Sequence, residues 1–162
     1  MTDAPSDAAS LGHHTQLIGR ITVADELQAT IVELIDLALL GKQLSWSATG
    51  PHASAVRRML EELVVRVRIH TDEVAARMIE LGHLPSGQSR TVAIETDLTP
   101  LPPGRLDAED ARAALAERIA QVRTRLVRSR CTTGEDAITT ELFADIHDNL
   151  LAADASPAGL SD

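Results

Sequence analysis

Four charged residues between positions 57 and 72 have the spacing of a single ionic stripe along a helix. Arg57, Glu61, Arg68 and Asp72 are separated by four, seven and four residues, which places them on nearly one line of an α-helix. Two interpretations stay open. Arg57 can pair with Glu61 and Arg68 with Asp72 on a solvated face. Alternatively, Glu61 and Asp72 can act as hard oxygen ligands for a metal ion.

Two pairs of His and Glu also have helical spacing. Helical-bundle di-iron proteins use two Glu-x-x-His motifs on separate helices, each supported by a further Glu. This chain has one such motif, Glu80 with His83, and the histidine follows a glycine that should end the helix. His70 and Glu73 have the reverse order. We therefore expect no di-iron site within one chain, and the single Cys131, without a nearby His or second Cys, offers no alternative centre.

The composition favours a helical protein and opposes some partners. Hydrophobic residues make up 44% of the chain but aromatic residues only 1%, which suits helix-on-helix packing better than a sandwich or barrel. The net charge of −9 opposes non-specific attraction to DNA. The sequence has no apolar run near the length of a membrane span and no signal-peptide pattern at its start. We expect a cytoplasmic protein without a membrane partner.

Apolar residues recur at helical spacing in four segments of the chain. A Thr22–Asp25 capping box is expected to start the first helix, and Gly82 followed by Pro85 to end the second. The expected helices run from about residue 22 to 46–50, from 54 or 55 to 82, from a cap at Asp107 to about 130, and from a cap at Thr133 and Asp136 to about 151.

A long connection at residues 83–106 separates the second and third helices. Such a length predicts some structure of its own, a short helix or a strand at residues 90–96, and lets the third helix run parallel to the second. We expect a bundle domain at residues 21–152, with a flexible arm at 1–20 and a flexible tail at 153–162.

The same spacing predicts which side chains form the core. The positions expected to be buried are Leu27, Ile31, Leu34, Ile35, Ala38 and Leu39, then Leu60, Leu63, Val67, Val74, Met78 and Leu81, then Leu115, Ile119, Val122 and Leu126, and finally Ile138, Leu142, Ile146 and Leu150.

Two segments of the chain resemble the Dps family, the DNA-binding proteins from starved cells, which is a ferritin-like group. Its members carry A-H-W-N-x-x-G, a fixed spacer and D-x-x-A-E-R-x-x-x-L-G-G-x-P. This chain has L-S-W-S-A-T-G at 44–50 and D-E-V-A-A-R-M-I-E-L-G-H-L-P at 72–85, with the spacing between them unchanged. The resemblance extends over most of residues 22–151, including T-P-L at 99–101 and E-L-F-A-D-I at 141–146.

The resemblance implies a ferritin-like four-helix bundle with a short helix in the crossover, assembled as a homo-oligomeric shell of twelve subunits. It also implies an iron-oxidising site shared by two subunits. This chain departs from the family at that site. The two family histidines fall at Ser45 and Arg57, a family Asp falls at Glu61, the next is retained as Asp72, and the family Glu falls at Ala76.

Loss of these ligands predicts an impaired centre. Arg57 carries a permanent positive charge that repels a metal ion, and we expect it to act as a counterion for Glu61 or, across the subunit interface, for Asp72. Iron binding and residual ferroxidase activity are left open by this reasoning. A working oxidase that uses Glu61 and Asp72 with His70 or His52 is the enzyme alternative.

The family's other partners give two further expectations. Family shells admit ions through acidic pores, for which Glu135 and Asp136 are the candidate residues, although acids also suit an ordinary helix N-terminus. Members that bind DNA often use basic tails. Here the arm has only Arg20 against Asp3 and Asp7, so direct DNA binding is disfavoured, and a nucleoid-binding role stays as the third hypothesis.

Overall fold

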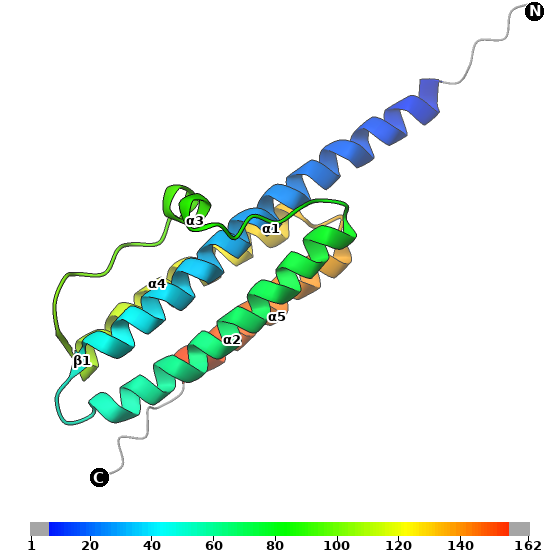
Figure 1. Cartoon of the computed structure of the whole chain (residues 1–162). Helices are drawn as coiled ribbons and strands as arrows, with labels where there is room; N and C mark the ends of the chain where they lie inside the picture. Colours follow the sequence, from blue (N-terminus) through cyan, green and yellow to red (C-terminus); the bar gives the residue numbers. More distant parts are fainter. Residues whose placement is uncertain (1–6, 156–162) are drawn as a thin grey trace, which may run out of the picture.

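Four long helices and one short helix make up the fold, which confirms the expected all-helical bundle (Figure 1). The computed structural model describes residues 7–155, with side chains described from Val23 to Ala153. In chain order the elements are α1 (Asp7–Ser47), β1 (Ala48–Thr49), α2 (Ala53–Glu80), α3 (Ser89–Glu95), β2 (Leu106–Asp107), α4 (Ala108–Thr132) and α5 (Ala137–Ala155).

The start of α1 differs from the expectation. The helix begins at Asp7 and passes straight through the supposed capping box at Thr22, so that its first turns extend beyond the other helices (Figure 1). Starting a helix is costly, whereas extending one that packing already holds adds one hydrogen bond per residue. No proline interrupts residues 7–22 to stop that extension. Residues 1–6 of the expected arm and 156–162 of the expected tail lie outside the described residues.

The other helix ends follow from local chemistry as expected. The Asp107 side chain caps α4 by accepting a hydrogen bond of 2.9 Å from the Asp110 backbone N–H. Asp136 does the same for α5 through the Thr139 backbone N–H, at 3.1 Å. After α2, Gly82 adopts a φ of +84°, a left-handed conformation in which a glycine is not strained.

The crossover sets the directions of the helices. α1 and α2 are antiparallel neighbours, whereas α4 runs in the same direction as α2, as the long connection predicts (Figure 1). Its expected short element is a helix, α3. The two short strands pair in parallel, Ala48 with Leu106 and Thr49 with Asp107, which ties the end of α1 to the start of α4.

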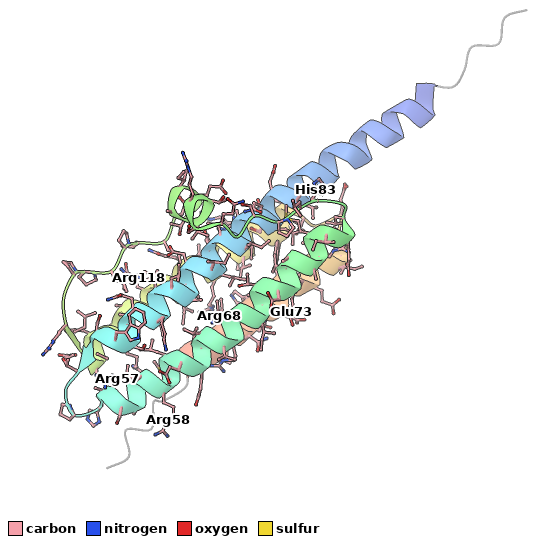
Figure 2. All side chains as sticks on the ribbon, viewed as in Figure 1. Arg57, Arg58, Arg68, Glu73, His83 and Arg118 are labelled. Atoms are coloured by element: carbon pink, nitrogen blue, oxygen red, sulfur yellow. The ribbon has the colours of Figure 1, made fainter. Side chains whose placement is uncertain are left out.

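Arg118 fastens the connection to the bundle from α4 (Figure 2). Although its side chain is almost fully buried, its guanidinium donates to the carbonyl oxygens of Thr99 at 3.0 Å and Pro100 at 2.7 Å. Gln28 holds the other part of the connection by exchanging two hydrogen bonds of 2.9 Å with the Ser86 backbone. These bonds satisfy polar groups that would otherwise be costly to bury.

The core lies between the long helices and contains most of the predicted positions. Two predictions were wrong, since Leu39 is 55% exposed and Ile138 is 62% exposed. Both lie at the edge of an apolar stripe, where spacing alone does not separate core from surface. None of the helices in the described part of the chain is long and apolar enough to cross a membrane. The largest fully buried side chains are Phe143, Leu27, Ile31, Leu34, Leu37, Leu44, Leu60, Ile119, Leu126, Ile146, Leu150 and Val32.

Candidate metal centre

Arg57 is a helix-capping residue in this structure. Its Nε donates to the Ser45 carbonyl oxygen at 3.1 Å, and its Nη2 donates to the Ala48 carbonyl oxygen at 2.6 Å. Ser45 lies in the last turn of α1, where backbone oxygens lack helical partners and the helix dipole favours a cation, and Ala48 is the first residue of β1, directly after the helix. Figure 2 places Arg57 on the first part of α2, beside the turn from α1. The guanidinium therefore closes the junction between the two helices.

The expected pairing of Arg57 with Glu61 was wrong. Among the described residues, no ion pair joins Arg57 to Glu61 or Arg68 to Asp72. Glu61 instead lies 3.5 Å from Nζ of Lys42 on α1, in a pair whose two side chains are both well exposed. The helix-end carbonyls outcompete Glu61 for the guanidinium because they combine hydrogen bonding with the dipole field.

Ser45 and Arg57, at the two positions where the family resemblance implies histidines, both make contacts that hold the end of α1. Ser45 is buried, and its Oγ donates to the Lys42 carbonyl oxygen at 2.8 Å. Arg57 bonds the same end of α1 from α2. Ala76 is exposed and contributes no ligand atom. On one chain, an ion near Glu61 would therefore meet one carboxylate and one anchored cation, because Asp72 lies eleven residues farther along α2, about 16 Å away along the helix axis.

Glu61 and Asp72 share the exposed face of the α1–α2 pair. Asp72 lines a shallow pocket of about 230 Å³ together with Leu39 and Arg68. Within the described residues, nowhere do three or more His, Cys, Asp or Glu side chains gather in a way that could hold a metal ion.

The histidine alternatives do not converge on these carboxylates. His70 is half-buried and its Nδ1 lies 2.8 Å from Oε2 of Glu73 on the same helix. His83 lies in the connection just after α2, well along the bundle from Arg57 (Figure 2). His52 is exposed at the N-terminal end of α2. Glu80, the other residue of the single Glu-x-x-His motif, is bonded to Arg77 at 3.0 Å.

Asp136, one of the two candidate pore residues, has a structural role in the chain. Its carboxylate caps α5 and accepts hydrogen bonds from Nη2 of Arg77 at 2.9 and 3.0 Å. Burial alone would raise the pKa of Asp136, but the hydrogen bonds from Thr139 and Arg77 outweigh it and lower this pKa below its usual value. Glu135 lines a neighbouring cavity of about 780 Å³ with Cys131.

Sequence reasoning missed a second set of charges, which is buried between α1 and α4. Glu33 is 5% exposed and forms an ion pair of 2.9 Å with Nε of Arg125. The sequence does contain a sign of this pair of carboxylates, because Glu26 and Glu33 are seven residues apart and each comes directly before a core leucine. That spacing places both carboxylates at the edge of the apolar stripe, but it does not identify their partner.

Comparisons with known proteins agree with this fold. Residues 24–150 match the model of the ferritin-like domain. The DNA protection during starvation protein of Agrobacterium fabrum is 29% identical over 143 residues, which cover 87% of this chain and 82% of that protein. The fine tangled pili major subunit of Haemophilus ducreyi is 40% identical over 89 residues, 54% of this chain and 47% of that protein.

Solved structures give the same assignment. The Dps of Mycobacterium smegmatis in its tetragonal form superimposes with a TM-score of 0.80 at 26% identity, covering 84% of this chain and 83% of that one. Together, the match to the domain model, the relatives and the structural likeness show that this chain belongs to the ferritin-like family and, within it, to the Dps group.

Proposed function

We propose that this chain is a homo-oligomeric Dps shell protein in iron handling or stress protection whose inter-subunit ferroxidase centre is lost or strongly impaired. The single observation that carries the proposal is the position of Arg57. It occupies a place where the family resemblance implies a metal-binding histidine, and its guanidinium is bonded to the end of α1 at 3.1 and 2.6 Å.

The anchoring of Arg57 explains why the loss is more than a missing ligand. Arginine stays protonated at any physiological pH, so its charge repels Fe(II) beside Glu61, one turn farther along α2. To vacate the position, the side chain would have to give up two hydrogen bonds to carbonyls that have no other helical partner. Both remaining carboxylates are exposed, and they are about 16 Å apart along α2, so they could hold one ion only as Glu61 of one subunit and Asp72 of another.

The surface beside Arg57 supports assembly with further copies of the chain. Five large apolar side chains of the described part of the α1–α2 pair are exposed, with 55% exposure for Leu39, 68% for Trp46, 59% for Val65, 52% for Ile69 and 59% for Ile79. Exposed apolar groups on one face are typical of an interface. A two-fold contact between copies would cover them, and the family resemblance places its shared site at such a contact. We propose the twelve-subunit shell of the family for this chain.

The enzyme alternative requires a non-standard site in which His70 or His52 joins Glu61 and Asp72. His70 lies two residues before Asp72, a spacing that turns the two side chains to different faces of α2, and its Nδ1 is bonded to Glu73. The DNA-binding alternative is supported by the Agrobacterium relative, which is named a DNA protection during starvation protein. Against it stands the formal net charge of −9, which disfavours contact with phosphates. We therefore rank both below an impaired shell.

The direct test is Fe(II) oxidation by the metal-stripped protein, measured against a protein-free control. We expect equal rates. A saturable, protein-dependent rate would contradict the proposal and favour the enzyme alternative. In parallel, the triple variant Ser45→His, Arg57→His and Ala76→Glu should gain iron affinity and oxidation rate.

A matched control separates the effect of the site from that of added histidine. It replaces Arg57→His by Arg58→His in the triple variant, because Arg58 is the exposed neighbour on the same helix. This control should gain little. If the folded triple variant assembles but binds no more iron than the control, the idea of a remnant site fails.

The DNA alternative has its own experiment. Intact shells mixed with duplex DNA at low ionic strength should leave its electrophoretic mobility unchanged, because the chain is acidic. Retardation that disappears as salt is added would indicate phosphate contacts and revive the nucleoid hypothesis.

A further inference from the structure

Two carboxylates of α1 share one arginine of α4, in a cluster that we call the α1–α4 joint. It consists of Glu26, Glu33, Arg125 and Ser129. Arg125 places its Nε 2.9 Å from Oε1 of Glu33 and its Nη1 3.2 Å from Oε2 of Glu26. The side chain of Glu33 is only 7% exposed, against 23% for Glu26. One positive charge thus faces two negative ones in a largely buried place.

The hydrogen bonds of the joint are distributed unequally. Oε2 of Glu26 accepts from both Arg125 and the Ser129 hydroxyl. The Glu26 backbone oxygen and the Thr30 hydroxyl also accept from Nη2 of Arg125, at 3.1 and 3.2 Å. Glu33 has the Nε contact alone, and no described residue donates to its Oε2. Since a carboxylate is stabilised by each donor it accepts from, Glu26 is the better-held anion and Glu33 the poorer one.

Further charges surround Glu33 from each element packed against it. Asp97 approaches from the connection, and Glu117, Arg125 and Arg128 approach from α4. Glu117 is paired with Arg118 at 2.7 Å, and Arg128 is exposed at the rim. Near Glu33, the carboxylates of Glu26 and Asp97 are therefore opposed mainly by the single charge of Arg125.

An open cleft gives solvent a route to this buried carboxyl group. It has a volume of about 440 Å³ and lies between α1, the connection and α4. Burial raises the pKa of Glu33 from 4.5 to about 7, even though the ion pair with Arg125 lowers it, and Asp97 and Glu26 add to the rise. Protons can therefore exchange with a group that is both poorly held as an anion and accessible.

We propose that Glu33 is the proton-binding residue of the α1–α4 joint and makes the contact of α1 with α4 and the connection respond to pH near neutrality. When Glu33 is protonated, Arg125 pairs with Glu26 alone, and the joint no longer carries an excess negative charge. When Glu33 ionises, two carboxylates compete for one guanidinium in a medium of low dielectric constant, and Asp97 is repelled. The joint then loosens, beginning with the connection around Asp97. This proposal does not depend on iron chemistry.

The protonated form can be observed directly in the full-length protein. Infrared spectroscopy separates the carbonyl band of a neutral carboxyl group from that of a carboxylate. We expect one such band to persist above about pH 5, where free glutamic acid is ionised, and to disappear near pH 7. The band should be absent from Glu33→Gln, and its midpoint should fall to a lower pH in Asp97→Asn because a repelling charge has been removed.

Thermal unfolding supplies an independent readout. Between about pH 5 and pH 8 the melting temperature of the wild type should fall, whereas that of Glu33→Gln should stay nearly level. Glu62→Gln is the matched control, because Glu62 is exposed on α2 and should leave the wild-type slope unchanged. If Glu33→Gln does not fold, the infrared titration of the wild type and of Asp97→Asn decides. Complete ionisation of every carboxyl group below pH 5.5, or an unchanged slope in Glu33→Gln, would overturn the proposal.

Discussion

The α1–α2 face and the α1–α4 joint contain the same kinds of charged side chain in opposite surroundings. On the α1–α2 face, Glu61 is 3.5 Å from Lys42 and both side chains are exposed to water. In the α1–α4 joint, Glu33 is 2.9 Å from Arg125 and almost fully buried. Exposed pairs contribute little because water screens them, whereas a buried charge that loses its partner is costly. The difference shows that burial decides how much an ion pair, or the loss of one partner, changes the stability of the fold.

Arg57 stands between these extremes. It is exposed, yet it contributes through hydrogen bonds to backbone oxygens that lack other partners. Its role depends on the geometry of the helix end rather than on a neighbouring acid. The ranking of the three sites, from the buried joint through the capped junction to the exposed pair, can be tested by substitution.

The largest effect is expected for Arg125→Ala. This change leaves Glu26 and Glu33 without their common counterion, so the free energy of unfolding should fall by about 3–5 kcal/mol above about pH 8, where Glu33 is ionised in the wild type. Chemical denaturation of the assembled protein measures it. Arg128→Ala, at the exposed rim of the same cleft, should cost less than about 0.5 kcal/mol. Equal losses of unfolding free energy in the two variants would contradict the prediction, because they would mean that the buried Arg125 stabilises the fold no more than an exposed arginine does.

Next in size is the pH dependence of stability, to which Glu33 and Asp136 contribute with opposite signs. The folded state raises the pKa of Glu33, so its contribution is fully present below 4.5 and is lost as the pH rises through about 7. The folded state lowers the pKa of Asp136, so its contribution is present above 3.8 and is lost as the pH falls through the folded-state value.

Stability should therefore be greatest in weakly acidic solution, between these two ranges. The loss toward alkaline pH should be on the order of 2 kcal/mol after allowance for water in the cleft. Denaturation midpoints measured across the pH range test this shape. A maximum above pH 8 would contradict the assignment of Glu33, and unchanged acid stability in Asp136→Asn would contradict that of Asp136.

A smaller effect is expected for Arg57→Ala. The variant loses two hydrogen bonds and a favourable charge at the end of α1, which together should cost about 1–2 kcal/mol. Hydrogen exchange should show faster opening of the last turn of α1 before any global unfolding. Arg58→Ala is the control, and a loss as large in that variant would remove the case for capping.

The smallest effect is expected for the exposed pair. Lys42→Met should change the free energy of unfolding by less than about 0.5 kcal/mol, because both partners are hydrated and the distance is long. Urea denaturation at low and high salt measures any contribution. A loss above 1 kcal/mol would show that an assembled neighbour buries this pair.

The sequence alone determined the helical architecture to a large extent. Caps at Asp107 and Asp136 and the glycine at position 82 act within a few residues, so their consequences were predicted correctly. The crossover also followed from its length, and the motif around Trp46 and residues 72–85 identified the Dps group. Helix caps and family motifs both depend on residues that are close together in the sequence, so both can be recognised without the structure.

Tertiary structure decided what spacing could not. The start of α1 depended on a helix continuing beyond its packed part, and the exposure of Leu39 and Ile138 depended on which helix covers each stripe. The partner of Arg57 proved to be the backbone of a different helix rather than Glu61, four residues away. Glu33 and Arg125 are 92 positions apart, and only the packing of α1 on α4 makes them a buried pair. Spacing restricts the neighbours on one helix, whereas charge partners and burial between helices are set by packing.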